Sequence, residues 1–207
     1  ERTTQPGILL KRIGPNGLKG GLGYGGPCFP RDNIAFSATA RRFGAEAPLS
    51  EVTDSLNRRS TARLGDLVVS ILKKGQTVRI LGLSYKTSTG VVDESQGVML
   101  AHCLCSKKVR VVVYDPAAMD AAREILGGEV VFAASMEECA AQADVLVIAT
   151  PWDQFRSLNA THLSRETVVL DCWRILRPDA VEPSARYIPL GLGPAEGRSR
   201  LATSTGH

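Results

Sequence analysis

The sequence predicts an α/β fold, in which a helical connecting arm precedes a doubly wound, all-parallel sheet domain. Up to Gly75 the apolar residues recur at helical spacing, whereas after it short apolar runs alternate with amphipathic stretches of helical length. Strands separated by helices are typical of βαβ units, whose strands are parallel. We therefore divide the chain into an arm at residues 1–74, a sheet domain at 75–193 and a mobile tail at 194–207.

The arm holds two predicted helices, Asp32–Phe43 and Leu49–Lys74, with Gly44 and Gly75 as their stop signals. The second spans about seven turns, so it either bridges two domains or forms a subunit interface, or simply packs in the core. In the sheet domain the expected strands are Val78–Leu83, Val109–Tyr114, Val130–Phe132, Val145–Ala149 and Val168–Leu170, and the expected helices are Ser95–Ser106, Ala117–Leu126 and Ser135–Gln142.

Composition and charge narrow the class of function. With 207 residues, 43% of them hydrophobic, the chain can bury a sizeable core, and its formal charge of +4 is scattered. This favours a phosphate-bearing small molecule as ligand over nucleic acid. Five irregularly spaced cysteines indicate reduced thiols in the cytoplasm, and neither they nor His102 and His162 have the spacing of a metal site.

The ends and the hydropathy of the chain give two further expectations. No run approaches the roughly 18 apolar residues that span a bilayer, so we expect no membrane partner. The sequence opens on Glu1-Arg-Thr-Thr, without an initiator Met or a signal-peptide pattern. We therefore expect it to begin within a longer protein.

A glycine-rich stretch leads to a cysteine at a predicted helix start. Residues Gly14 to Gly26 include seven glycines, which form either a structured loop or a flexible linker. A thiol near a helix N-terminus has its thiolate stabilised by free N–H groups, so Cys28 is a candidate nucleophile; the alternative is a buried cysteine beside a linker. Asp32 either caps the helix or orients a water or proton-transfer group beside the thiol.

Several of these residues resemble the active-site signature of the UDP-glucose/GDP-mannose dehydrogenase family. The match comprises Arg12-Ile-Gly, Leu18-Lys19, Gly23-Tyr-Gly-Gly, Cys28-Phe-Pro and Asp32, with offsets that agree over more than twenty residues. Further matches are Ile80-Leu-Gly-Leu-Ser-Tyr-Lys86, similar to the family's Gly-x-x-x-Lys loop, Asp93-Glu-Ser95, Tyr114-Asp-Pro116 and Ile148-Ala-Thr-Pro-Trp-Asp153. The last two are fold markers, and Trp152 either packs or binds.

The resemblance implies a Rossmann-like, sugar-nucleotide-binding sheet domain in an NAD-dependent dehydrogenase. Such an enzyme oxidises UDP-glucose to UDP-glucuronate by two hydride transfers, through a cysteine thiohemiacetal and thioester. It also implies a homodimer or a higher homo-oligomer. The Gly-x-Gly-x-x-Gly fingerprint that binds most of the NAD belongs, in the family, to an N-terminal Rossmann domain, which we do not find in this sequence.

The resemblance assigns a role to each matching residue. Cys28 and Asp32 are the catalytic pair, and Arg31 stands beside the cofactor where the family usually has lysine; otherwise Arg31 is a surface charge. Arg12 reaches the substrate from a neighbouring subunit. The sugar and its phosphates are wrapped by the peptide of Lys19, Gly20, Gly21, Leu22, Gly23, Tyr24 and Gly25, and the nucleotide contacts Tyr85 and Lys86, at the strand end where open α/β sheets bind ligands.

Two departures from the family pattern leave a second hypothesis open. Asp93 replaces an arginine that contacts the dinucleotide, and Asp171-Cys-Trp-Arg174 replaces Asp-Gly-Arg. The alternative to an enzyme is therefore a catalytically impaired sugar-nucleotide-binding or regulatory module. Cys28-Phe-Pro and Gly23-Tyr-Gly favour UDP-glucose over GDP-mannose or UDP-N-acetylhexosamines, and Cys103, Cys105, Cys139 and Cys172 are interpreted as buried thiols.

Overall fold

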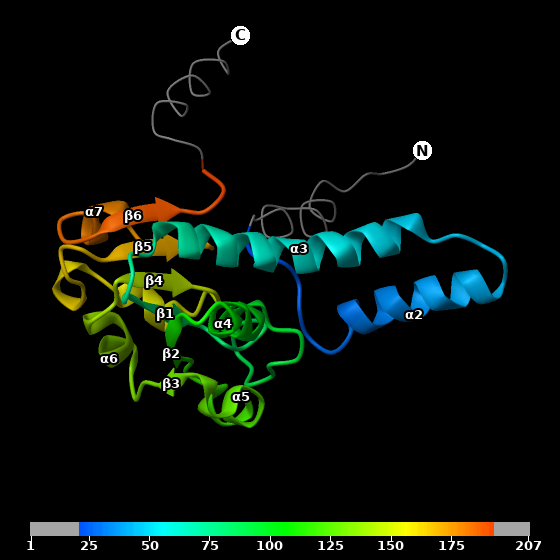
Figure 1. Ribbon diagram of the computed structural model, residues 1–207, viewed down its shortest axis with the longest axis horizontal. Helices are drawn as coiled ribbons and strands as arrows, with labels where there is room; N and C mark the ends of the chain where they lie inside the picture. The colour runs from blue at the N-terminus through cyan, green and yellow to red at the C-terminus, as the bar shows by residue number, and fades with distance from the viewer. Residues whose placement is uncertain (1–20, 193–207) are drawn as a thin grey trace, which may run out of the picture.

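The computed structural model describes residues 21–192 as a six-stranded, all-parallel sheet covered by helices, with a long helical hairpin extending from it (Figure 1). This confirms the predicted α/β fold with its helical arm. Arg12, Lys19, Gly20 and the tail at 194–207 lie outside the described residues. No helix within residues 21–192 combines the length and the apolar run needed to cross a membrane.

The arm is an antiparallel pair of helices, α2 (Phe29–Arg42) and α3 (Pro48–Ile71). Helix α2 begins three residues before the predicted start, because Pro30 fits the first turn of a helix, where its missing N–H costs nothing. Helix α3 ends before the predicted Lys74, since the backbone becomes extended at Leu72 (φ −71°, ψ 139°). Gly75 therefore lies in the turn before the sheet and does not end the helix.

The sheet has the strand order β3-β2-β1-β4-β5-β6, so the direction of winding reverses between β1 and β4. Ligands in open α/β sheets bind outside the carboxyl ends of the strands at such a switch point. The last strand, β6, was not predicted. The strands are β1 (Thr77–Leu81), β2 (Arg110–Tyr114), β3 (Val131–Phe132), β4 (Val145–Ile148), β5 (Val168–Asp171) and β6 (Arg186–Pro189).

The connecting helices match the prediction apart from their ends and one omission, α7. Two predicted first residues are N-caps instead: the Ser95 hydroxyl accepts from Val98 N at 3.5 Å, and that of Ser135 from Glu138 N at 3.1 Å. The elements are α4 (Gln96–Ser106), α5 (Met119–Leu126), α6 (Met136–Ala141), α7 (Pro178–Val181) and the 3-10 turns η1 (Gly127–Glu129), η2 (Asp153–Ser157) and η3 (Ala160–His162).

Both faces of the sheet are buried, as alternating side chains of one strand show. In β4, Val145 and Val147 pack with α3, α4 and α5, whereas Leu146 and Ile148 pack with α6 and the segments after β4 and β5. All four are almost completely buried. Leu64 of α3 belongs to the first of these clusters, so the long helix is anchored in the sheet domain and carries the arm away from it.

Candidate active site

The glycine segment, defined here as residues 21–27, lies directly against the loop that follows β1. Gly26 N donates to Asp93 O at 2.7 Å, and a Cβ on Gly26 (φ +87°) would lie 2.6 Å from the ring of Tyr85. A Cβ on Gly25 would lie 2.4 Å from Glu94 O. The structure therefore brings two of the sequence-predicted segments together, and over its described part the glycine segment is a structured loop rather than a linker.

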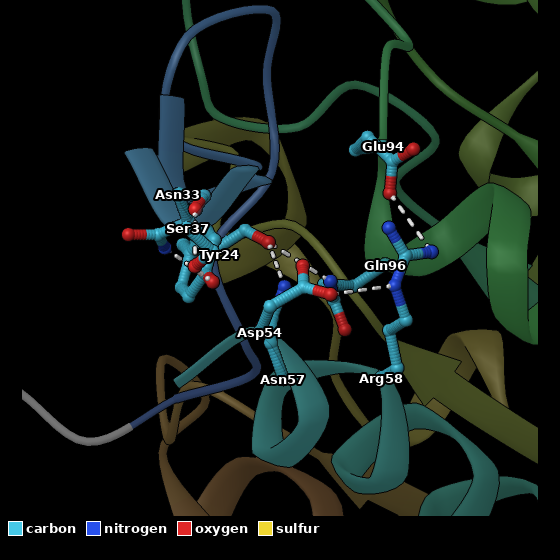
Figure 2. Close-up of polar contacts among 8 residues, drawn as sticks. All are labelled: Tyr24, Asn33, Ser37, Asp54, Asn57, Arg58, Glu94 and Gln96. Atoms are coloured by element: carbon cyan, nitrogen blue, oxygen red, sulfur yellow. Dashed lines mark hydrogen bonds and ion pairs between the residues drawn. The ribbon is translucent and has the colours of Figure 1, made fainter. Parts of the chain in front are cut away.

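The peptide of Tyr24 is held by two helices, α3 of the arm and α4 of the sheet domain (Figure 2). Its carbonyl accepts from Asn57 Nδ2 of α3 at 2.8 Å and from Gln96 Nε2 of α4 at 3.0 Å. The Gln96 side chain also accepts from the hydroxyl of Thr61. At the other end of the tyrosine, Asn33 Nδ2 donates to the phenol oxygen at 2.9 Å.

Sequence reasoning missed Asn57 and Gln96, although one signal was present. Asn57 and Thr61 are four residues apart on the buried side of α3, and a polar residue in that position needs a hydrogen-bond partner. Nothing local identifies Tyr24 as that partner. A second arm-to-domain contact runs through Arg58, whose hydrogen bond to Asp54 (3.1 Å) raises its pKa and whose Nη1 lies 3.6 Å from Glu94 Oε2.

Cys28 occupies the N-cap of α2 and is exposed, so the buried-cysteine alternative is wrong. Its side chain makes no capping hydrogen bond, while its carbonyl accepts from Asp32 N at 2.8 Å. Asp32 is therefore inside the first turn, and its interpretation as a helix cap is also wrong. Its carboxylate accepts from Arg31 Nε at 2.9 Å, and this hydrogen bond raises the pKa of the Arg31 guanidinium.

The other four cysteines, all within the described residues, are less accessible. Cys139 and Cys172 are buried, as expected, but Cys103 and Cys105 are only half-buried, which corrects the prediction. Burial raises the pKa of Cys139 to about 12 and also raises that of Cys172. Desolvation, followed by the charge of Glu129, raises the pKa of Cys105. Among the five thiols, Cys28 is the most exposed.

The loop carrying Tyr85 and Lys86 is fixed from below by a buried carboxylate. Asp115 Oδ2 accepts from Leu83 N at 2.7 Å and Ser84 N at 2.9 Å, directly after β1. Trp152 Nε1 donates to Ser84 Oγ at 3.0 Å and to Asp115 Oδ2 at 3.1 Å. Trp152 therefore packs against the core and supports the loop after β1 through these two hydrogen bonds.

Opposite charges surround the region between the glycine segment and this loop. Lys86 Nζ lies 5.3 Å from the centroid of the Tyr85 ring, a cation–π distance, and remains exposed. Nearby is a cavity of about 460 Å³, lined by Gly26, Pro27, Pro30, Arg31, Ile34, Ala35, Asp93 and Glu94. It combines the positive N-terminus of α2 and one arginine with two carboxylates.

The two histidines of the described residues, His102 and His162, contact other groups of the protein. His102 Nδ1 lies 3.0 Å from Glu129 Oε2, and His162 accepts from Asn159 N at 3.3 Å at the start of its own 3-10 turn. Within residues 21–192, no cluster of three or more His, Cys, Asp or Glu side chains is arranged to hold a metal ion.

Comparison with known proteins matches the chain to two domains of one enzyme family. Residues 8–59 match the central domain of the UDP-glucose/GDP-mannose dehydrogenase family, and residues 79–178 match its UDP binding domain. The chain is 33% identical over 187 residues to a UDP-glucose 6-dehydrogenase of Rhizobium meliloti, covering 87% of this chain and 43% of that protein. It is 35% identical over 170 residues to one from Haloferax volcanii, covering 81% and 39%.

Solved structures agree with these matches. A UDP-glucose dehydrogenase from Pyrobaculum islandicum superposes with a TM-score of 0.73 at 31% identity, covering 91% of this chain and 42% of that one. A GDP-mannose dehydrogenase from Pseudomonas aeruginosa shares the fold, with a TM-score of 0.69 at 22% identity over 88% of this chain and 44% of its own. The chain spans about two fifths of the length of the curated relatives it matches. By sequence and by fold, the chain belongs to the UDP-glucose/GDP-mannose dehydrogenase family and carries its central-domain and UDP-binding-domain regions.

Proposed function

We propose that this chain is the nucleophile-bearing and substrate-binding part of an NAD-dependent UDP-glucose 6-dehydrogenase, which oxidises UDP-glucose to UDP-glucuronate. The observation that carries the proposal is the position of Cys28. It is an exposed thiol at the N-cap of α2, and the glycine segment that precedes it is seated against the UDP-binding domain. Such a position leaves the sulfur accessible to a bound substrate, as covalent catalysis requires.

In the proposed reaction Cys28 holds the sugar's C6 carbon between two oxidations. NAD, when bound, accepts a hydride from that carbon in each oxidation, and the hydroxyl proton leaves to solvent. After the first, the thiolate adds to the aldehyde carbon, and the carbonyl oxygen takes a proton to give a thiohemiacetal. The second leaves a thioester, which water attacks. The C–S bond breaks, the uronate leaves as its carboxylate, Cys28 is regenerated as the thiolate, and the two protons of the water pass to solvent.

Asp32 is proposed to orient that water. It lies four residues after Cys28, so the two positions share one face at the start of α2. Its carboxylate is already directed by Arg31. The sugar and its phosphates are proposed to lie along the glycine segment, with Arg12, Lys19 and Gly20 contributing from the preceding residues, and the nucleotide against Tyr85 and Lys86.

The fit of this chain to the cofactor is partial. Arg31 and the N-terminus of α2 suit the cofactor's phosphates, but Asp93 and Glu94 face the same cavity and oppose a phosphate there. The proposal assigns most of the NAD contacts to a dinucleotide-binding half outside the present chain. We expect the longer protein to bind NAD weakly and the Asp93→Arg variant to bind it more tightly.

We also propose that the chain forms a homodimer through the arm. Large apolar side chains on α2 and at the start of α3 are exposed, including Phe36 at 63%, Phe43 at 80% and Leu49 at 81%. A group of such residues on a soluble domain marks a contact surface. Sedimentation velocity would show a dimer that Phe43→Ser weakens; a monomer at all concentrations would contradict this part of the proposal.

The alternative, a binding or regulatory module without catalysis, is favoured by one observation, the two carboxylates of Asp93 and Glu94 that line the same cavity as Arg31. The two functions are separated by following NADH absorbance with UDP-glucose and NAD. The longer protein should form two NADH per sugar, its Cys28→Ser variant at most one, because only the second oxidation passes through the thiohemiacetal, and its Cys103→Ser control the full amount. The present chain alone should be inactive, because near-attack geometry requires the missing dinucleotide site.

Two results would contradict the enzyme. Undiminished turnover by the Cys28→Ser variant would exclude the thioester route, and turnover by the isolated chain would show that our division of the site is wrong. An inactive longer protein that still binds UDP-glucose would favour the binding module.

A further inference from the structure

The turn after β5 contains the second departure from the family pattern, and one buried carboxylate holds it. Asp171 accepts from Trp173 N at 3.0 Å, Leu176 N at 2.9 Å and the Tyr187 phenol at 3.0 Å. Burial, followed by the charge of Asp171, raises the pKa of Tyr187, so the phenol remains a donor. The backbone of the turn is therefore fixed.

The indole of Trp173 is anchored at the carboxyl end of the neighbouring strand. Its Nε1 donates to Ala149 O, just after β4, at 2.8 Å. The next residue, Arg174, has a left-handed backbone (φ +55°) and donates from Nη1 to Leu190 O at 2.6 Å. The backbone of Trp173 is held by Asp171 and its indole nitrogen by Ala149 O, so the ring has little freedom to move.

The six-membered ring of this indole lies against Gly21, the first described residue of the glycine segment. A Cβ built on Gly21 would lie 2.5 Å from Cζ3, 2.6 Å from Cε3 and 2.8 Å from Cη2 of Trp173. Real Cβ atoms do not approach carbon so closely, so only glycine fits against the ring as it stands. The contact joins the glycine segment to the end of the sheet, 152 positions along the chain.

We propose that Trp173 is a positioning residue for the sugar nucleotide, which seats the start of the glycine segment on the carboxyl edge of the sheet. The proposal rests on the proposed function, because it assumes that the peptide groups of this segment contact the substrate. Three residues further on, Tyr24 is held by Asn57 and Gln96. The backbone from Gly21 to Tyr24 is thus fixed at both ends before a ligand binds.

Fixing this backbone in advance lowers the cost of binding. A glycine-rich chain has more conformational freedom to lose than any other, and ordering it on ligand binding would subtract from the affinity. At this turn Trp173 supplies an aromatic plane against Gly21, and an arginine follows directly as Arg174.

A double-mutant cycle tests the contact directly. Isothermal calorimetry would compare UDP-glucose binding by the wild-type chain, Gly21→Ala, Trp173→Ala and the double variant. Contacting residues couple strongly, so we expect Gly21→Ala to weaken binding about tenfold in the wild-type background and to have no further effect once the ring is gone. Gly128→Ala is the matched control, because a Cβ there meets nothing within 4 Å.

A second measurement does not depend on the ligand. Amide hydrogen exchange at residues 21–24 should be faster in Trp173→Ala than in wild type, while the unfolding midpoint of Gly21→Ala stays close to that of the Gly128→Ala control. Unchanged exchange, or an equal cost of Gly21→Ala in both backgrounds, would overturn the positioning role. A wild-type chain that binds no UDP-glucose would instead refute the proposed function, and the exchange rates would still decide whether Trp173 positions the segment.

Discussion

The sheet domain and the arm differ in how far their large apolar side chains are buried. Both faces of the sheet are covered, one by α6 and the segments after β4 and β5, the other by α4, α5 and the C-terminal half of α3, so the large apolar side chains there are almost all inside. Helix α2 has 14 residues, of which only Pro30 and Ser37 are buried, while three phenylalanines and an isoleucine around it are exposed: Phe29, Ile34, Phe36 and Phe43. The sheet domain and the C-terminal half of α3 therefore form one closed core, whereas α2 leaves its large apolar side chains exposed.

Their polar contacts differ in the same way. In the sheet domain, buried Asp115 and Asp171 each accept several hydrogen bonds and fix the loops at the carboxyl edge. In the arm, the ion pairs of Arg31 with Asp32 and of Arg41 with Glu51 are exposed, and such pairs contribute little to stability. The molecule thus combines a sheet domain whose loops are held by buried hydrogen bonds with an arm whose ion pairs are exposed, and the two regions should respond differently to mutation.

Thiol reactivity should show the largest difference between the two regions. At pH 8 the thiolate fraction of Cys139 is about one in ten thousand, because its pKa is about 12. Brief alkylation and peptide mapping should therefore modify exposed Cys28 first, and the gap should narrow as pH rises towards 12. A urea-unfolded sample, labelled at all five cysteines, is the control. Equal labelling of Cys139 and Cys28 in the folded chain would remove the basis for assigning the nucleophile.

Truncating an apolar side chain should matter in the sheet domain and not in the arm. We expect Leu146→Ala to lower the free energy of unfolding by about 2–5 kcal/mol, since the residue is fully buried and leaves a cavity. Phe36→Ala, which removes a larger but exposed side chain, should change it by less than about 0.5 kcal/mol. Urea unfolding measures both. A large loss for Phe36→Ala at low protein concentration would mean that the arm is packed after all.

If the sheet domain contains the whole nucleotide-binding site, the present chain should bind the nucleotide without a dinucleotide-binding domain. Lys86→Ala should weaken UDP binding by about 1–3 kcal/mol, because it removes a charged hydrogen-bond donor. Calorimetry on the present chain measures this. Lys74→Ala, at the amino end of β1, is the matched control and should bind as the wild type does. Equal affinities for all three proteins would place the nucleotide elsewhere.

The smallest effect is expected for the ion pair that joins the two regions. Arg58 Nη1 and Glu94 Oε2 are 3.6 Å apart and substantially exposed, so Glu94→Gln should change the free energy of unfolding by about 0–1 kcal/mol. The change should vanish in high salt as screening increases. A loss that persists in 1 M salt would show that the bridge is shielded from solvent and braces the arm.

The sequence predicted most of the sheet domain because its strands and helices follow strict periodicities. β6 was missed because it is a four-residue edge strand ending in Pro189, which lacks the apolar alternation of an inner strand. The start of α2 was missed because Pro30 reads as a breaker unless the first helical turn is recognised. For the site, the motif located Cys28 and Tyr85, but the roles of Asn57, Gln96 and Trp173 depend on contacts between distant parts of the chain. Local patterns do not encode such contacts.

The hairpin geometry of the arm has a mechanical consequence. Helix α3 is about 36 Å long. Its buried residues begin at Asn57, so its first nine residues, a length of roughly 13 Å, have no buried side chain and act as a lever. Because α2 returns antiparallel to α3, Cys28 sits at the pivot end of this lever and Phe43 at its tip (Figure 1). A tilt of about 5° would move the tip by about 1 Å and the thiol by much less. The arm can therefore adapt at its tip to whatever it touches without moving the sulfur from its place beside the glycine segment.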